Sequence, residues 1–422
     1  MRDTTALAVG SAASGLLAYV FFALSTRTLG AVEAAPVSVL WTYWTFAGAA
    51  LTFPLQHWIA RTAAANDGEA GLRAAMPRVA ALVMTTALLA AGVSWLIRTP
   101  LFGRDDPGFP VLVGLITLGS GLVGILRGGL SARRRFTAVA TAMVLENGLR
   151  CVAAAGLVVA GVESALTVGI CMAAGALLCL AWPSALRFRR EGPMTAAGSP
   201  LRFLSGASGG QLLAQAVLTG GPVLLALSGG DAADVTALFV ALALFRAPYM
   251  LAIGLVAPLT GRLTVLFVQG RHAELRRVRL LVLGGTVLTT GAAGLIGALV
   301  GPALLQLIFG DQVHLSSYLT AIVAVGSATA LTSLVMTVMI LAQSRSSAVA
   351  RAWSVAALVG AGVFALLPAG PLPRTCWAFV TAEVVALVAL VVEELRGSAR
   401  GTADPDGQPS PPGSEGQVGV PG

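Results

Sequence analysis

The feature that most constrains the fold of this chain is a series of apolar runs about twenty residues long, each bounded by charged residues, proline or glycine. A helix of about twenty residues crosses the roughly 30 Å hydrocarbon core of a bilayer, and it satisfies its backbone hydrogen bonds internally. We therefore predict an all-α polytopic membrane protein. Its twelve transmembrane helices are predicted over residues 6–24, 36–58, 79–97, 109–126, 137–161, 164–186, 204–228, 234–258, 280–300, 316–342, 349–367 and 375–395.

Composition excludes a soluble globular protein of this size. Of the 422 residues, 56% are hydrophobic and 11% are charged, whereas soluble domains carry about 25% charged residues. The net charge is +8, but the arginines lie mostly in short segments between apolar runs, so we predict no nucleic-acid partner. The four cysteines lie within or at the edge of apolar runs, with neither metal-ligand nor disulfide spacing.

Arginine alternates from one predicted loop to the next. Most arginines lie in loops on the same side as the two termini, while the loops on the other side hold only Arg27, Arg98, Arg104 and Arg374. Cytoplasmic loops of membrane proteins are enriched in Arg and Lys. We therefore predict a location in the cytoplasmic membrane with both termini in the cytoplasm.

Short sequence matches indicate that a six-helix unit has been duplicated, because they occur in the same order on equivalent runs. The matched segments are Ser11–Gly15 with Ser205–Gly209, Pro54-Leu55 with Pro258-Leu259, and Leu101–Gly103 with Ile308–Gly310. Two parallel six-helix halves around a central cavity are the predicted architecture. The predicted domains are an N-terminal half over residues 1–190, a cytoplasmic connector over 191–203, a C-terminal half over 204–396 and a disordered cytoplasmic tail over 397–422.

The fifth apolar run carries three polar residues near its middle, Glu146, Asn147 and Arg150. Ionisable groups at bilayer depth are costly unless they face protein or a water-filled cavity. Glu146 and Arg150 are four residues apart and share a helix face, so they can neutralise each other. Two interpretations stay open: a structural ion pair that fixes the helix in the bundle, or a cavity face that presents Arg150 and Asn147 to an anionic substrate.

The eighth run carries Arg246 near its middle, two residues before Pro248 and without an acid within one turn. Arg150 and Arg246 are the only arginines that we expect at this depth. A planar guanidinium suits phosphate oxygens, so Arg246 is predicted to line the cavity, and Pro248 is predicted to bend the helix. The alternative is an ion pair with Glu146 or Glu383. Glu383 of the twelfth run is a candidate for proton or cation coupling and, equally, for a structural partner of Arg246.

An aromatic cluster occupies the second run, at Trp41, Tyr43, Trp44 and Phe46. Such a cluster is typical of the membrane interface, but it could also stack on sugar rings. The sequence shows no Ser/His/Asp set, no glycine-rich phosphate loop and no cluster of metal ligands, so we predict neither an enzyme nor a cofactor or metal site.

Three segments resemble the polysaccharide (O-antigen-type) flippases of the multidrug/oligosaccharidyl-lipid/polysaccharide exporter superfamily. They are Arg27-Thr28-Leu29-Gly30, the segment Gly301–Gly310 and Phe245-Arg246-Ala247-Pro248. The chain departs from the family pattern after Gly30, where Pro36 stands in place of a glycine.

The resemblance implies alternating-access translocation of an undecaprenyl-pyrophosphate-linked saccharide for cell-surface polysaccharide synthesis. It implies membrane lipids, glycosyltransferases and a polymerase of the same pathway as partners, and it adds Arg27 to Arg150, Arg246 and Asn147 as candidate substrate-binding residues. A cation-coupled multidrug or metabolite exporter of the same superfamily is the alternative, with Glu146 and Glu383 lining its cavity. A major-facilitator transporter would need the Gly-x-x-x-Asp-Arg-x-Gly-Arg loop, which the segment from Arg61 to Arg78 lacks. A membrane glycosyltransferase would need larger outer loops.

Overall fold

The computed structural model describes residues 2–65, 69–189, 200–253, 265–267, 269–343 and 345–403, together with residues 259 and 263. The described residues form helices and connecting turns without any strand. Most of the predicted connector, Pro258 of the sequence repeat and the tail beyond residue 403 lie outside them.

As far as they are described, all twelve predicted runs lie on helices. Eight runs are single helices long and apolar enough to cross a membrane. These are α1 (Arg2–Glu33), α4 (Ala70–Leu96), α6 (Gly108–Ala132), α7 (Phe136–Val159), α14 (His272–Leu299), α16 (Ser317–Ala342), α17 (Ser346–Leu366) and α18 (Pro371–Ala403). The chain is a multi-pass membrane protein.

The other four runs are interrupted helices, and a proline lies at or just after each interruption: Pro54, Pro183, Pro222 and Pro248. Proline lacks an amide donor and its ring displaces the carbonyl one turn earlier, so the helix must break, bend or widen. The run that contains Pro222 bends by 67°. The four interrupted runs are α2 (Ala35–Ala47) with η1 (Gly48–Thr52) and α3 (Phe53–Ala65); α8 (Ala165–Ala174) with η2 (Gly175–Ala181) and η3 (Pro183–Leu186); α9 (Pro200–Thr219) with α10 (Gly221–Leu227); and α11 (Ala232–Phe245) with α12 (Ala247–Ile253).

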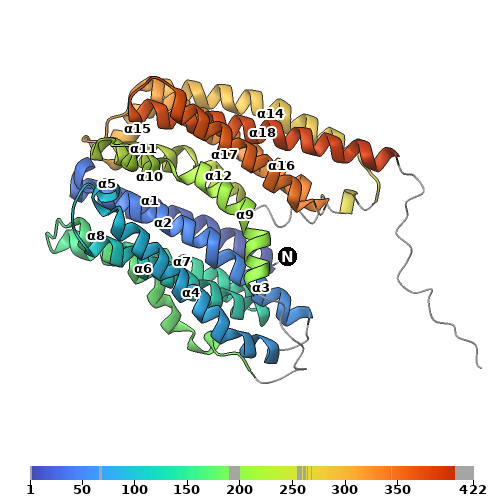
Figure 1. Cartoon of the computed structure of the whole chain (residues 1–422), viewed down its shortest axis with the longest axis horizontal. Helices are drawn as coiled ribbons and strands as arrows, with labels where there is room; N and C mark the ends of the chain where they lie inside the picture. The colour runs from blue at the N-terminus through green and yellow to red at the C-terminus, as the bar shows by residue number, and fades with distance from the viewer. Residues whose placement is uncertain are drawn as a thin grey trace, which may run out of the picture.

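The helices form two halves with the same internal packing. In the N-terminal half α1 packs on α7, α4 on α6, and α6 and α7 on α8; in the C-terminal half α9 packs on α17, α14 on α16, and α16 and α17 on α18. Figure 1 shows the two halves as separate layers, blue to green below and green to red above. Short helices α5 (Arg98–Phe102) and α15 (Gly301–Phe309) occupy equivalent positions, and each is followed by a glycine with positive φ. The predicted fold of two six-helix halves is therefore confirmed.

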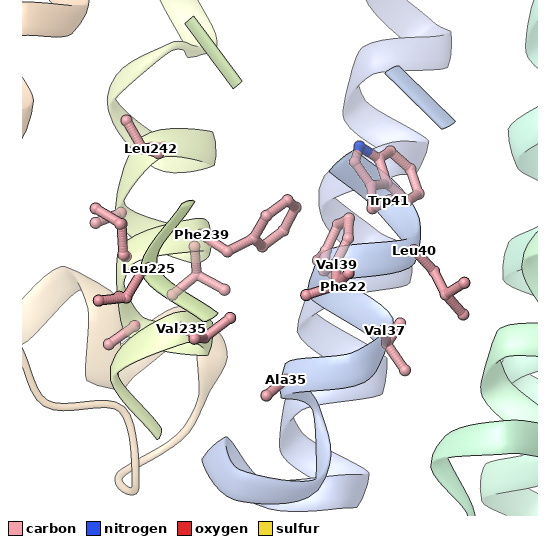
Figure 2. Packing of buried hydrophobic residues seen from close by; sticks show 14 of the residues in the cluster. Phe22, Ala35, Val37, Val39, Leu40, Trp41, Leu225, Val235, Phe239 and Leu242 are labelled. Atoms are coloured by element: carbon pink, nitrogen blue, oxygen red, sulfur yellow. The ribbon is translucent and has the colours of Figure 1, made fainter. Parts of the chain in front are cut away.

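The two halves meet along α1 and α2 on one side and α10 and α11 on the other, through a continuous apolar core. The rings of Phe22 and Phe239 lie 4.3 Å apart, and Trp41 packs edge-on against Phe22 at 4.4 Å. Figure 2 shows Phe239 extending from α11 toward Phe22 and Trp41. A buried hydrogen bond of 2.6 Å from Thr236 Oγ1 to the Ala31 carbonyl also joins α11 to α1.

Arg27 and Gly30 form a second contact between the halves, at the end of α1. Arg27 donates hydrogen bonds to the carbonyls of Leu307 and Ile308 at the C-terminus of α15, where the helix dipole favours a cation. Gly30 has φ 74° and ψ 170°, a conformation that only glycine adopts readily. A Cβ at Gly30 would also lie 2.3 Å from Gln312 Oε1. Glycine at this position therefore permits the close approach of the two halves.

The C-terminal helix is longer than predicted. Helix α18 extends to Ala403, so residues 397–403, which were predicted to belong to a disordered tail, are helical. The chain has no proline between Pro373 and Pro405, so no residue of this stretch lacks the amide donor that a helix needs. The helix can therefore continue past the end of the apolar run.

A carboxylate fixes three loops of the N-terminal half on the side of the N-terminus. Glu69 accepts hydrogen bonds from Arg133 Nε at 2.8 Å and Nη2 at 3.0 Å, and from the Arg189 amide at 2.8 Å. Burial alone would raise the pKa of the Glu69 carboxyl, but the bonds and charges of Arg133 and Arg189 outweigh it and lower the pKa. In the C-terminal half, Glu393 of α18 pairs with Arg345 and Arg351.

We expect Glu69→Gln to lower the unfolding temperature at neutral pH, because Glu69 loses its charge and bidentate pairing. A carboxyl whose pKa is lowered by folding stabilises the protein above its unfolded pKa of about 4.5, and that stabilisation is lost as the pH falls through the folded value. The difference in unfolding temperature between wild type and variant should therefore shrink below about pH 4.5. Thermal unfolding of the purified protein at several pH values measures it. Glu163→Gln, at an exposed loop position, is the matched control. A difference that persisted at low pH would contradict this account.

Candidate functional site

A large cavity lies between the two halves, with a volume of about 1390 Å³ that includes some open solvent. The N-terminal half contributes α1, α2, η1, α3, α6 and α7 to its walls, and the C-terminal half contributes α9, α10, α11 and α12. The charged lining groups are Arg127, Glu146 and Arg246. The other polar lining residues include Ser11, Ser14, Thr42, Thr45, Thr52, Asn147, Gln215 and Thr219, and the aromatic ones are Tyr19, Phe22, Trp41, Trp44, Phe53, Phe239 and Tyr249.

Glu146 of α7 is the centre of a buried network on the N-terminal wall. Its Oε2 accepts a hydrogen bond of 2.5 Å from Arg127, and its Oε1 accepts bonds from Arg150 at 2.9 Å and from Trp44 Nε1 at 3.2 Å. Both carboxylate oxygens are therefore occupied. Asn147 bonds Arg150 through its oxygen and Ser14 of α1 through its nitrogen.

Arg150 is in contact with Glu146, as the spacing of four residues predicts, but it does not line the cavity. It is 2% exposed and lies behind the wall, where it donates to Glu146, to Asn147 and to the Met172 carbonyl at 3.0 Å. Gly175 leaves room for the guanidinium, because a Cβ there would lie 2.6 Å from Arg150 Nε. Arg150 was predicted to be presented to a substrate, but its guanidinium is enclosed by protein groups and does not line the cavity.

Arg127 of α6 is a cavity residue that the sequence analysis assigned to a cytoplasmic loop. The apolar run was taken to end at residue 126, whereas α6 continues to Ala132 and carries Arg127 into the bundle with 6% exposure. Its Nε is buried without a hydrogen-bond partner. The expectation of only two arginines at bilayer depth was therefore wrong. The uncharged residues Gly128, Gly129 and Leu130 after Arg127 were the signal that the span continued.

Arg246 lines the C-terminal wall, at the break between α11 and α12 that Pro248 was predicted to cause. It is 9% exposed, and its Nε is buried without a hydrogen-bond partner. No ion pair of the described residues includes it, and Glu146, one suggested partner, is paired with Arg127 and Arg150 instead. In the last turn of α11 the Ala243 carbonyl accepts a hydrogen bond from Tyr19 of α1, which ties the two walls together next to Arg246.

Glu383 lies inside α18, fully buried, and is not part of the cavity wall. Neither of its carboxylate oxygens has a hydrogen-bond partner in the described part of the chain. Its electrostatic partner is Arg246. The structure thus places Glu383 behind Arg246, without the direct ion pair that the alternative interpretation assumed.

Two further sequence candidates lie elsewhere than predicted. Arg27 does not line the cavity and donates to a carbonyl at the C-terminus of α15. The aromatic cluster of α2 had two interpretations, a membrane-interface belt and a surface for sugar rings; Trp41 is buried, and both Trp41 and Trp44 line the cavity. Packing against α1 and α7 turns these rings inward, which the sequence pattern alone does not specify.

The charges of the site favour an anion. Glu146 has both oxygens bonded to arginine or tryptophan donors, while Arg127 and Arg246 each keep an unpaired N–H. An anionic ligand in the cavity would pair with these two guanidinium groups. Among the described residues no group of three or more His, Cys, Asp or Glu side chains could hold a metal ion.

Comparison with known proteins gives a fold but no close relative. No family model matches the sequence, and no curated protein matches it. A solved structure of the lipid II flippase MurJ, in an inward-closed conformation, superimposes with a TM-score of 0.72 at 11% identity, covering 94% of this chain and 90% of that one. The chain has the fold of MOP superfamily transporters.

Two structures described as MOP superfamily members support that statement. An inward-facing multidrug resistance MATE family transporter matches with a TM-score of 0.64 at 17% identity, over 92% of this chain and 95% of that one. A transporter from Pyrococcus furiosus, whose binding pocket is described as reversed in polarity, matches with a TM-score of 0.60 at 13% identity, over 95% and 96%.

Proposed function

We propose that the chain translocates a lipid-diphosphate-linked saccharide across the cytoplasmic membrane by alternating access of its two halves, with both termini in the cytoplasm. The observation that carries this proposal is the pair of cavity-lining arginines, Arg127 on the N-terminal wall and Arg246 on the C-terminal wall. A diphosphate offers oxygens to both. The likeness to a lipid II flippase supports a lipid-linked substrate.

Alternating access is supported by the position of the apolar core. The contact of Phe22 with Phe239, and the packing of Trp41 against Phe22, close one end of the interface, and the cavity lies beyond them. The Arg27 contact with α15 holds the same end together. Opening that end while closing the other would expose the cavity alternately to the two sides of the membrane. Glycosyltransferases and a polymerase that handle the same saccharide are the proposed partners.

The second candidate is multidrug export, favoured by the aromatic residues of the cavity wall and by the likeness to MATE family transporters. Such an exporter would recognise organic cations. Its weakness is the absence of a free acid on the described cavity wall, since Glu146 is fully bonded and Glu383 lies behind Arg246.

One reconstitution distinguishes the two. The purified chain is placed in lipid vesicles that contain an undecaprenyl diphosphate carrying one hexose, and a membrane-impermeant lectin reports the sugars exposed on the outer leaflet. The flippase proposal predicts protein-dependent movement of the sugar from the inner leaflet to the outer one. Efflux of a cationic dye from the same vesicles, without any sugar movement, would replace the proposal by the exporter.

A further inference from the structure

Three neighbours fix the ring of Trp44 in the cavity wall. The Arg150 guanidinium lies over one face of the indole at 4.4 Å from the ring centroid. The indole Nε1 donates to Glu146 Oε1 at 3.2 Å. Trp41 packs edge-on against it at 4.7 Å. Both the position and the tilt of the ring are therefore set before any ligand binds.

Trp44 borders the cavity between the two halves. Trp44 lines the cavity and is only partly buried, whereas Arg150, which covers one face of the ring, lies outside the lining and is 2% exposed. Because the guanidinium covers one face of the indole, a ligand in the cavity would approach the ring from another side. A cation on the rear face is a stable arrangement, because the guanidinium is attracted by the ring quadrupole.

We propose that Trp44 is a preorganised stacking platform for a sugar ring, and that Arg150 is a positioning residue that holds the platform from behind. The inference rests on the proposed function, because the saccharide attached to the diphosphate is the ligand it assigns to Trp44. Pyranose rings present a face of C–H groups, and an aromatic face is the matching apolar surface. Glu146 connects the platform to Arg127, so sugar and diphosphate would bind next to each other on one wall.

A role in positioning Trp44 is consistent with the enclosed position of Arg150. It bonds Glu146, Asn147 and the Met172 carbonyl, and it stacks on Trp44, so none of its contacts requires access to the ligand. Its planar guanidinium is needed for the stacking, and lysine would keep the charge but not the plane.

The test compares two probes on the same protein in lipid nanodiscs: undecaprenyl diphosphate, and the same lipid carrying one hexose. We expect wild type to prefer the hexose form by about tenfold, which corresponds to ~1.4 kcal/mol. Trp44→Leu should remove this preference while keeping the affinity for the bare diphosphate lipid. Trp44→Phe should keep part of it. Arg150→Lys should reduce the preference, because the rear face of the ring loses its support.

The ratio of the two affinities separates stacking from folding, since a poorly folded variant would bind both lipids less. Trp95→Leu, at a ring 45% exposed and outside the cavity, is the matched control and should keep the wild-type ratio. If Trp44→Leu keeps the preference of wild type, the platform is wrong and the diphosphate site stands. If wild type binds neither lipid, both the platform and the proposed function are wrong.

Discussion

Replacing Arg246 with alanine is expected to abolish most of the transport of a lipid-linked saccharide. Hydrogen bonds between charged groups contribute about 1.5–3 kcal/mol, and a bidentate contact to a diphosphate belongs at the upper end of that range. A loss of about 2–3 kcal/mol corresponds to a roughly 30- to 150-fold weaker affinity. The measurement is the lectin-reported movement of a hexose-bearing diphosphate lipid in vesicles, together with its affinity in nanodiscs. Arg246→Lys should retain part of both.

The design must separate binding from stability, because Glu383 depends on Arg246. Removing the guanidinium leaves the fully buried carboxyl group of Glu383 without its electrostatic partner, and an unsatisfied buried polar group destabilises a fold. The double variant Arg246→Ala with Glu383→Gln removes that penalty. We expect the double variant to regain normal protein levels and thermal stability while its transport stays low. Recovery of transport in the double variant would show that Arg246 serves only to neutralise Glu383.

Replacing Glu146 with glutamine is expected to produce the largest loss of stability. Glu146 lies between Arg127 and Arg150, and all three side chains are at most 8% exposed. The substitution leaves two like charges next to each other without the acid that joins them. Breaking a buried ion pair from one side costs about 3–5 kcal/mol. Thermal unfolding of the purified protein, followed by tryptophan fluorescence, should show a correspondingly lower midpoint.

Arg127→Gln is the matched comparison within the same network. It leaves Glu146 and Arg150 as a balanced pair, so we expect a loss of only about 1–2 kcal/mol. The same variant removes one of the two cavity cations, and its affinity for a diphosphate lipid should fall. An Arg127→Gln protein as unstable as Glu146→Gln would mean that the network depends on geometry and not on its balance of charges.

The helices and their number were predictable from the sequence because the bilayer imposes one length and one backbone solution on every span. The duplication was also predictable, and the equivalent short helices α5 and α15 confirm the match between Leu101–Gly103 and Ile308–Gly310. The interrupted helix at Arg246 followed from Pro248. The pairing of Glu146 with Arg150 followed from their spacing on one helix. The helices, the break at Arg246 and the pair of Glu146 with Arg150 depend only on the lipid around a span or on residues within one helix.

Only the tertiary structure shows which neighbours each side chain faces. Arg127 stands at the end of an apolar run, where a charge at the membrane surface and a charge turned into the bundle have the same sequence pattern. Only the continuation of α6 places it beside Glu146. Trp44 and Arg150 likewise came from different runs, and their stacking depends on how α2 and α7 are placed by their common neighbours α6 and α8. A sequence specifies which faces of a helix are polar or apolar, but the neighbour of each face is chosen by packing between helices that are distant in the chain.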